Sequence, residues 1–524
     1  MTARQYSRHI HQGLSRRLRL CHDPHPASPG PGESAQGELG GNGGGMRGGT
    51  EAVWTTRWAI AALIGLTVIR LVVAAITPLA PDETYYWIWS RALSPGYLDH
   101  PPMVAWWIRA GTAIAGETAL GVRLLGPVSA AIGSILLFDA AERLFPGRQA
   151  GITAASLLNA TLIFGVGSVI MTPDTPLLFF WTAALWAAVR IAVNGPPTWW
   201  LPAWWLAAGA FSGLALLSKY TAAFLPVGFG LFALWARRDA LRQPGFWLGG
   251  LIGALLFLPV VFWNAAHDWA GFLRQGGRVA DWRPERAAGF LAELILGQIG
   301  LVTPGIFVLF VAGIYTALRS RQPGNRLLVM LSVPAALVFL QHAIGDRVQG
   351  NWPAIIWPAA ALAAAGMTAP VWRRWVVPSC ALGLGAAFLL YLHAASGWPV
   401  DARDPLARQL AGWPDLATRL EAARIEAGAS FIIAEPFGLA SELAWHLPAE
   451  VRIAGAGGRW RFFRLPRVEG METRGLLIRP ERYGAAPGGV PRPALSRIQD
   501  SVEIERYSVF LINGGDGAWL PRRR

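Results

Sequence analysis

The feature that most constrains this chain is a series of apolar stretches long enough to cross a membrane. A transmembrane helix needs about 20 apolar residues, and the region between Trp58 and His393 contains eleven stretches near that length. They cover residues 58–76, 119–138, 149–168, 174–192, 203–217, 220–236, 246–263, 292–317, 327–344, 353–369 and 375–393. The stretch 102–116 fits either a further span or a helix lying along the membrane. We therefore expect an all-α polytopic domain of about 11 transmembrane helices over residues 51–398.

The positions of the arginines predict how these helices are oriented. If the N-terminus lies in the cytoplasm, every inward loop carries Arg, and short loops are where the positive-inside rule applies. The inward residues are Arg143, Arg148, Arg190, Arg237, Arg238, Arg242, Arg319, Arg321, Arg326, Arg373 and Arg374. The net charge of +14 is thus spread over loops and not gathered on one face, so we expect no nucleic-acid partner.

The two ends of the chain differ from the apolar region. Residues 1–50 are rich in Gly, Arg, Ser and Pro and lack apolar periodicity, which predicts a disordered cytoplasmic tail; Met46 leaves open a later translation start. Residues 399–524 alternate helix-like and strand-like segments and predict a small α/β domain in the periplasm. A glycine-rich turn at 455–458 follows one of its strands, but such a turn alone is a weak sign of phosphate binding.

The first outward loop, PDETYYWIWSRALSPGYLDHPP, brings ionisable residues next to the membrane. They are Asp82, Glu83, Asp99 and His100. Ionisable groups are costly there unless they serve a function, and a carboxylate can take the proton of a sugar hydroxyl that attacks an anomeric carbon. Tyr85 and Tyr86 could stack on a sugar ring or anchor the helix at the interface. The alternative for Asp82 is that it only caps the helix beginning at PDET.

Two more residues are expected to face the same side. Asp174, in MTPDTP, lies at the outward mouth between two spans and is either a functional carboxylate or a helix cap. Lys219, in LLSKYTA, is the single Lys among 46 basic residues. A compact ammonium can hold the phosphate of a departing polyprenyl phosphate. Its alternative is a side chain that extends from a helix end to water, a role that Arg would fill equally well.

Two further outward segments carry polar residues. The loop NAAHDWAGFLRQGGRVADWRP contains His267, Asp268, Trp269, Arg274, Gln275 and Arg278, and the segment HAIGDRVQGNWPA contains Asp346, Arg347, Asn351 and Trp352. The arginines could grip a phosphate. The His and carboxylate side chains could hold a divalent cation, but no tight ligand spacing is present, so a metal stays open.

Taken in order, PDETYYWIWS, GYLDHPP, MTPDTP, LLSKYTA, WNAAHDWAGF and GNWPA resemble the C-type glycosyltransferases of the protein O-mannosyltransferase and aminoarabinose transferase superfamily. The resemblance covers about residues 58–360. It implies an inverting glycosyltransferase of the bacterial inner membrane. Its donor is a polyprenyl-phosphate sugar, and its acceptor is a lipid or cell-envelope polysaccharide reached from the periplasm. A polytopic lipid or sugar transporter is the alternative from another class, although its polar groups would be expected at mid-membrane.

The resemblance also implies roles for individual residues. Asp82 is then the principal catalytic carboxylate, and we expect Glu83 and Asp174 to belong to the catalytic group as well. The residues expected to bind donor and acceptor are Asp99, His100, Lys219, Tyr85, Tyr86, His267, Asp268 and Arg274.

Overall fold

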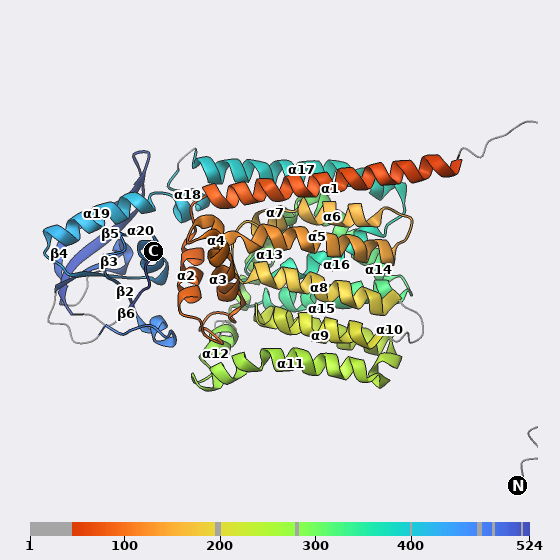
Figure 1. Ribbon diagram of the computed structural model, residues 1–524, viewed down its shortest axis with the longest axis horizontal. Coiled ribbons are helices and arrows are strands. Elements are labelled where there is room, and N and C mark those ends of the chain that lie inside the picture. The colour runs from red at the N-terminus through yellow and green to blue at the C-terminus, as the bar shows by residue number, and fades with distance from the viewer. Residues whose placement is uncertain are drawn as a thin grey trace, which may run out of the picture. The chain divides into compact units, whose positions relative to one another are not determined.

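The computed structural model describes residues 44–193, 201–277, 282–398, 401–468, 474–484, 488–514 and 517–523. Residues 1–43, most of the predicted tail, lie outside this range, and the first helix, α1 (Gly44–Ile76), already begins at Gly44. Residues 56–524 form one compact unit. Within it, a bundle of apolar helices is followed by a domain that contains a β-sheet (Figure 1).

Each of the eleven predicted stretches falls on helical segments. These are α1; α4 (Ala119–Arg123) with α5 (Leu125–Leu144); α6 (Ala150–Asn159) with α7 (Leu162–Gly167); α8 (Asp174–Val193); α9 (Leu201–Leu216); η1 (Tyr220–Ala223) with α10 (Phe224–Ala236); α11 (Pro244–Ala265); α13 (Ala287–Val302) with α14 (Pro304–Leu318); α15 (Pro323–His342); η5 (Trp352–Ile356) with α16 (Trp357–Ala365); and α17 (Pro370–Ser396).

The expected count of about 11 spans is not confirmed. By length and apolar composition, six of the described helices could cross a membrane, or seven if one bent pair counts as a span, and four others are apolar but shorter. The stretch 292–317, predicted as one span, is bent by 105° between α13 and α14. Thr303, at the bend, has a φ of 70°, and Pro304 begins the next helix, where it disfavours helical geometry in the preceding residue.

Two short helices lie across the bundle at one end (Figure 1). They are α2 (Pro81–Arg91) and α3 (Met103–Ala115). The stretch 102–116 is therefore a lateral helix and not a span. The loops near α2 bond to one another, since the backbone N–H of Met103 donates to Leu217 and that of Met171 donates to Glu83. We call this the α2 end; it comprises α2, residues 92–102, 169–174, 217–220 and 345–352.

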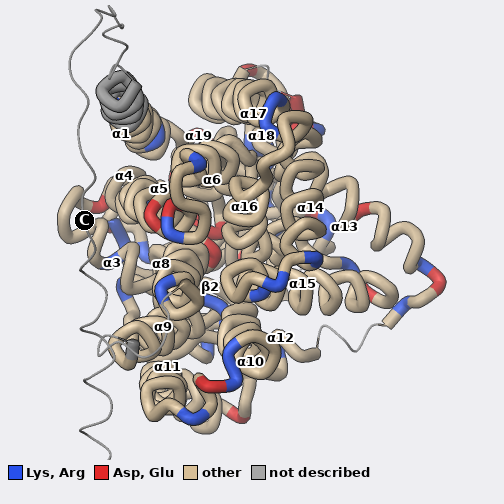
Figure 2. The backbone as a smooth tube through the Cα atoms, turned by 90° about the vertical axis from the view of Figure 1, so that its right-hand side faces the viewer, with Lys and Arg blue, Asp and Glu red and all other residues tan. Residues whose placement is uncertain are grey.

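The opposite end, here the arginine end, gathers loops for which inward orientation was predicted. It comprises residues 143–150, 190–193, 234–244, 319–326 and 365–374. Its loops also bond to one another: Arg148 donates to the carbonyl of Gly366 and Arg326 to that of Trp235. Figure 2 faces this end, with basic positions on the loops of several helices. Loops predicted to face outward therefore lie at the α2 end, and loops predicted to face inward lie at the arginine end.

The C-terminal part contains a six-stranded sheet. Its strands are β1 (Phe431–Ala434), β2 (Ile453–Ala456), β3 (Arg474–Pro480), β4 (Val490–Gln499), β5 (Val502–Asn513) and β6 (Gly517–Trp519), in the order β4-β5-β3-β1-β2-β6. Strands β3, β1 and β2 are parallel, and the outer ones antiparallel. The accompanying helices are α18 (Pro405–Leu410), α19 (Trp413–Glu426) and α20 (Phe437–His446). The predicted α/β character of this region is confirmed.

The C-terminal part shares a hydrophobic core with α2. Trp87, Trp89 and Ile88 of α2 have no exposed surface, and they belong to one buried cluster with α3, α19, α20 and the sheet. Trp87 packs edge-on against Trp445 of α20, with ring centroids 5.1 Å apart. Because α2 packs both on the bundle and on the C-terminal part, its position depends on both.

Candidate active site

Helix α2 is fixed at its start by a buried ion pair. Ala80 is the N-cap, Pro81 follows it, and Glu83 accepts a hydrogen bond from the N–H of Ala80 at 3.0 Å. Glu83 has no exposed surface and also pairs with buried Arg123, whose Nε lies 2.7 Å from Oε1. Glu83 was expected among the catalytic residues; in the structure its carboxylate is paired with Arg123 and bonded to the start of the helix.

Asp82, the next residue towards the N-terminus of α2, has a different environment. Its side chain is exposed, it is not the N-cap, and its carboxylate accepts no hydrogen bond from the described residues. The alternative that Asp82 caps the helix is therefore wrong. The surrounding protein removes part of its hydration and raises its pKa; Asp99 and Glu83 raise the pKa further, and Arg459 lowers it.

Asp99 joins the bundle to the C-terminal part. The hydroxyl of Tyr85 donates to its Oδ2 at 2.9 Å, Arg459 also donates to Oδ2, and Nε of Arg274 lies 3.6 Å from Oδ1. Gln275 bonds to its backbone carbonyl. A buried carboxylate is thus surrounded by donors from three segments of the chain, which are α2, α12 (Ala270–Gly276) and η6 (Gly458–Phe462).

Asp174 and Lys219 form a direct ion pair. The ammonium of Lys219 lies 2.8 and 2.9 Å from the two carboxylate oxygens, and the amide of Asn351 donates to Oδ2 at 2.6 Å. Three separate segments for which outward orientation was predicted therefore meet at Asp174. The side chain of Lys219 is 7% exposed, so it does not extend to water. The prediction that Lys219 lies at the site with Asp174 agrees with this geometry.

The charges of Asp82, Asp99 and Asp174 all act on Tyr86. It is buried, and its pKa is raised well above the usual value by burial and then by Asp82, Asp99, Tyr85 and Asp174. The ring of His100 lies beside Tyr86, with centroids 6.4 Å apart.

Two other predicted site residues, His267 and Asp268, lie just after helix α11. His267 stacks on Trp263 at a centroid distance of 4.3 Å and bonds to its carbonyl. Asp268 is exposed and has a φ of 53°. No described residue bonds to its carboxylate, while Arg278 lies outside the described residues. The structure thus gives His267 and Asp268 no contact with Asp82.

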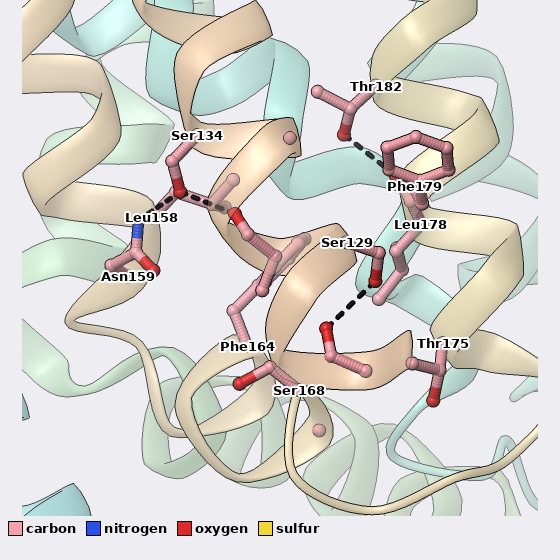
Figure 3. Close-up of a pocket in the computed structure, with 14 residues that line it drawn as sticks. Ser129, Ser134, Leu158, Asn159, Phe164, Ser168, Thr175, Leu178, Phe179 and Thr182 are labelled. Atoms are coloured by element: carbon pink, nitrogen blue, oxygen red, sulfur yellow. Dashed lines mark hydrogen bonds between the residues drawn. The ribbon is translucent and has the colours of Figure 1, made fainter. Parts of the chain in front are cut away.

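A groove lies within the helix bundle near Asp174. It lies between α5, α6, α7 and α8, and its lining includes Ser129, Ser134, Ser168, Thr175 and Thr182 (Figure 3). Each of these hydroxyls donates to a nearby backbone carbonyl at 2.7–2.9 Å. The groove, here the α5–α8 groove, thus presents mostly carbon to its contents, and Thr175 adjoins Asp174.

Arg459 and Arg123 were missed by the sequence interpretation. Arg459 directly follows the glycine-rich turn at 455–458, which offered the one local signal. Arg123 carries no signal in its own segment, because its partner Glu83 lies 40 residues away. Among the described residues, no group of three His, Cys, Asp or Glu side chains could hold a metal ion; the question of a cation stays open.

The chain is similar to known proteins both in sequence and in fold. Residues 99–263 match the family model described as dolichyl-phosphate-mannose-protein mannosyltransferase. The fold is similar to the crystal structure of ArnT from Cupriavidus metallidurans bound to undecaprenyl phosphate, with a TM-score of 0.62, 15% identity, and coverage of 87% of this chain and 98% of that one. The family match and the fold agree with the predicted resemblance to membrane glycosyltransferases of the C-type superfamily.

Two curated proteins are also similar to this chain in sequence. The chain is 28% identical over 406 residues to the lipid A galacturonosyltransferase RgtD of Rhizobium johnstonii, covering 75% of this chain and 83% of the relative. It is 25% identical over 338 residues to an undecaprenyl phosphate-α-4-amino-4-deoxy-L-arabinose arabinosyl transferase of Pseudomonas fluorescens, covering 58% of each. The transporter alternative gains no support from these comparisons.

Proposed function

We propose that this enzyme transfers a sugar, with inversion, from a polyprenyl-phosphate donor to a hydroxyl of lipid A or a similar envelope lipid on the periplasmic face. Support for the reactants comes from the relatives, one named for lipid A and one for undecaprenyl phosphate. Support for the face comes from the arginine-rich loops at the opposite end of the bundle.

The single observation that carries the chemistry is the pairing of the carboxylates. Glu83 is paired with Arg123 and Asp174 with Lys219, while Asp99 has two arginines beside it. Asp82 is exposed and accepts no hydrogen bond from the described residues. A general base needs an oxygen that is free to accept a proton, so we assign that role to Asp82 and a positioning role to Glu83.

The reaction follows from these assignments. The acceptor hydroxyl attacks the anomeric carbon and gives its proton to Asp82, while the bond from that carbon to the phosphate oxygen breaks. The polyprenyl phosphate leaves with the bonding electron pair, and the cations of Lys219 and Arg274 stabilise its negative charge. Lys219 would then exchange part of its contact with Asp174 for the phosphate, and one displacement inverts the configuration.

The α5–α8 groove is suited to a hydrocarbon chain. Its hydroxyls all donate to nearby backbone carbonyls, so a hydrocarbon chain lying there leaves these hydroxyls paired. Because Thr175 of the groove adjoins Asp174, we assign the groove to the prenyl chain of the donor.

The test is to incubate the full chain in lipid nanodiscs with a panel of undecaprenyl-phosphate sugars and lipid A, and to identify products by mass spectrometry. The panel contains galacturonate, aminoarabinose and mannose donors. We expect one donor to yield glycosylated lipid A and free undecaprenyl phosphate. Release of neither product from any donor by folded protein would contradict the proposal.

A further inference from the structure

The turn after strand β2 directs one arginine of the C-terminal part at helix α2. Gly457 has a φ of 95°, which glycine adopts without strain. The ring of Trp460 lies against Gly455, where an added Cβ would come within 2.3 Å of it. The chain is thereby fixed on both sides of Arg459.

The guanidinium of Arg459 has several partners near the site. It donates to Asp99 and, at 3.4 Å, to the hydroxyl of Tyr85. Its central carbon lies 4.3 Å from the ring centroid of Phe437 and 5.6 Å from that of Tyr85. A guanidinium held by a carboxylate and by aromatic faces has a defined position. Its neighbour Arg461 is exposed and contacts only the ring of Phe462 among the described residues.

We infer that Arg459 is a positioning residue supplied by the C-terminal part: it holds Asp99 and Tyr85 in place and adds a positive charge next to the acidic residues around Asp82. This inference rests on the proposed function, because it acts through the base assigned there. It gives the C-terminal part a direct effect on the reaction in addition to its packing against α2.

The charges around Asp82 determine the expected effect. The partial loss of hydration around Asp82 and the charges of Asp99 and Glu83 raise its pKa, and Arg459 lowers it. Helix α20, packed on α2, adds Glu442 and His446, which lie 3.3 Å apart, and α3 adds the exposed Arg109. Removal of Arg459 takes away the positive charge that lowers the pKa of Asp82, so this pKa rises further. A base is active only when ionised, so activity is lost at a higher pH than in the natural enzyme.

The experiment compares pH profiles of kcat/KM for the natural chain and three variants. Arg459→Gln should move the acidic limb to higher pH, so that activity at the acidic end falls severalfold more than at neutral pH. Arg459→Lys should keep the limb in place because the charge remains, whatever happens to kcat. Arg461→Gln is the matched control and should change neither. The substrates are lipid A and whichever undecaprenyl-phosphate sugar of the panel reacts.

A double variant separates charge from folding. Asp99→Asn combined with Arg459→Gln removes one opposing charge of each sign, and the acidic limb should return towards its natural position. An unchanged limb in Arg459→Gln, or equal shifts in Arg459→Gln and Arg459→Lys, would overturn the inference. Either result would leave the proposed function intact if the natural chain still transfers sugar; absence of transfer from every donor would instead contradict the function itself.

Discussion

The two ends of the helix bundle use carboxylates in opposite ways. At the arginine end, Asp139 of α5 accepts hydrogen bonds from Arg143, Arg190 and Trp186, and Arg190 also stacks 4.2 Å from the Trp186 ring. At the α2 end, Asp82 accepts none from the described residues. A fully paired carboxylate joins helices, whereas an unpaired one is available to a substrate. The comparison indicates that pairing, more than the presence of charge, distinguishes a reactive acid from a structural one.

The largest expected effect tests whether Glu83 is a structural acid of the same kind as Asp139. Glu83→Ala should lower the unfolding free energy by about 3–5 kcal/mol, because it leaves the buried charge of Arg123 without its partner. The measurement is thermal unfolding in nanodiscs. Glu117→Ala, which breaks the more exposed pair with Arg91, is the control and should cost less. A Glu83→Ala protein as stable as the natural chain would refute the structural assignment.

A smaller effect is expected from exchanging the single lysine. Lys219→Arg should reduce kcat/KM by about tenfold, because a planar guanidinium cannot take the place of a compact ammonium between Asp174 and a phosphate. The matched change at the arginine end is Arg238→Lys, at an exposed position, and it should leave steady-state rates unchanged. Equal rates for Lys219→Arg and the natural chain would contradict a role of Lys219 in holding the phosphate.

The smallest effect concerns the α5–α8 groove. Gly133 lines it, and a Cβ added there meets no atom within 4 Å. Gly133→Leu should therefore fill the groove without disturbing the fold and raise the donor KM a few-fold, because the prenyl chain loses packing contacts. Gly250→Leu on α11, where a Cβ also meets nothing, is the control. Equal donor KM values for both variants would show that no donor chain uses this groove.

The sequence suggested the candidate site residues that can be recognised within single segments. Apolar length located the helices, and the lone lysine and the acidic outward loops pointed to Lys219, Asp82, Asp99 and Asp174. Pairing could not be predicted, because it joins residues far apart in the chain: Arg459 reaches Asp99 across 360 positions. Without the pairing, Glu83 and Asp82 look alike.

The fold was likewise predictable only in part. The helices and strands between residues 413 and 456 were expected from their periodicity. Strands β3 to β6 were not predicted. Strand β4 contains Pro491 and Pro493, and prolines normally argue against a strand but are tolerated at a sheet edge. The bend at Thr303 lies within the apolar run 292–317, where Pro304 was a local sign of a break that apolar length alone did not reveal.

The most direct test of this account compares Asp82→Asn with Asp139→Asn in one assay of sugar transfer and thermal unfolding. Asp82→Asn should lower kcat about 10³-fold with almost no change in stability. Asp139→Asn should lower stability by about 1–3 kcal/mol and keep kcat at temperatures where it is folded. Full activity in Asp82→Asn would contradict the claim that the unpaired carboxylate at the α2 end is the base.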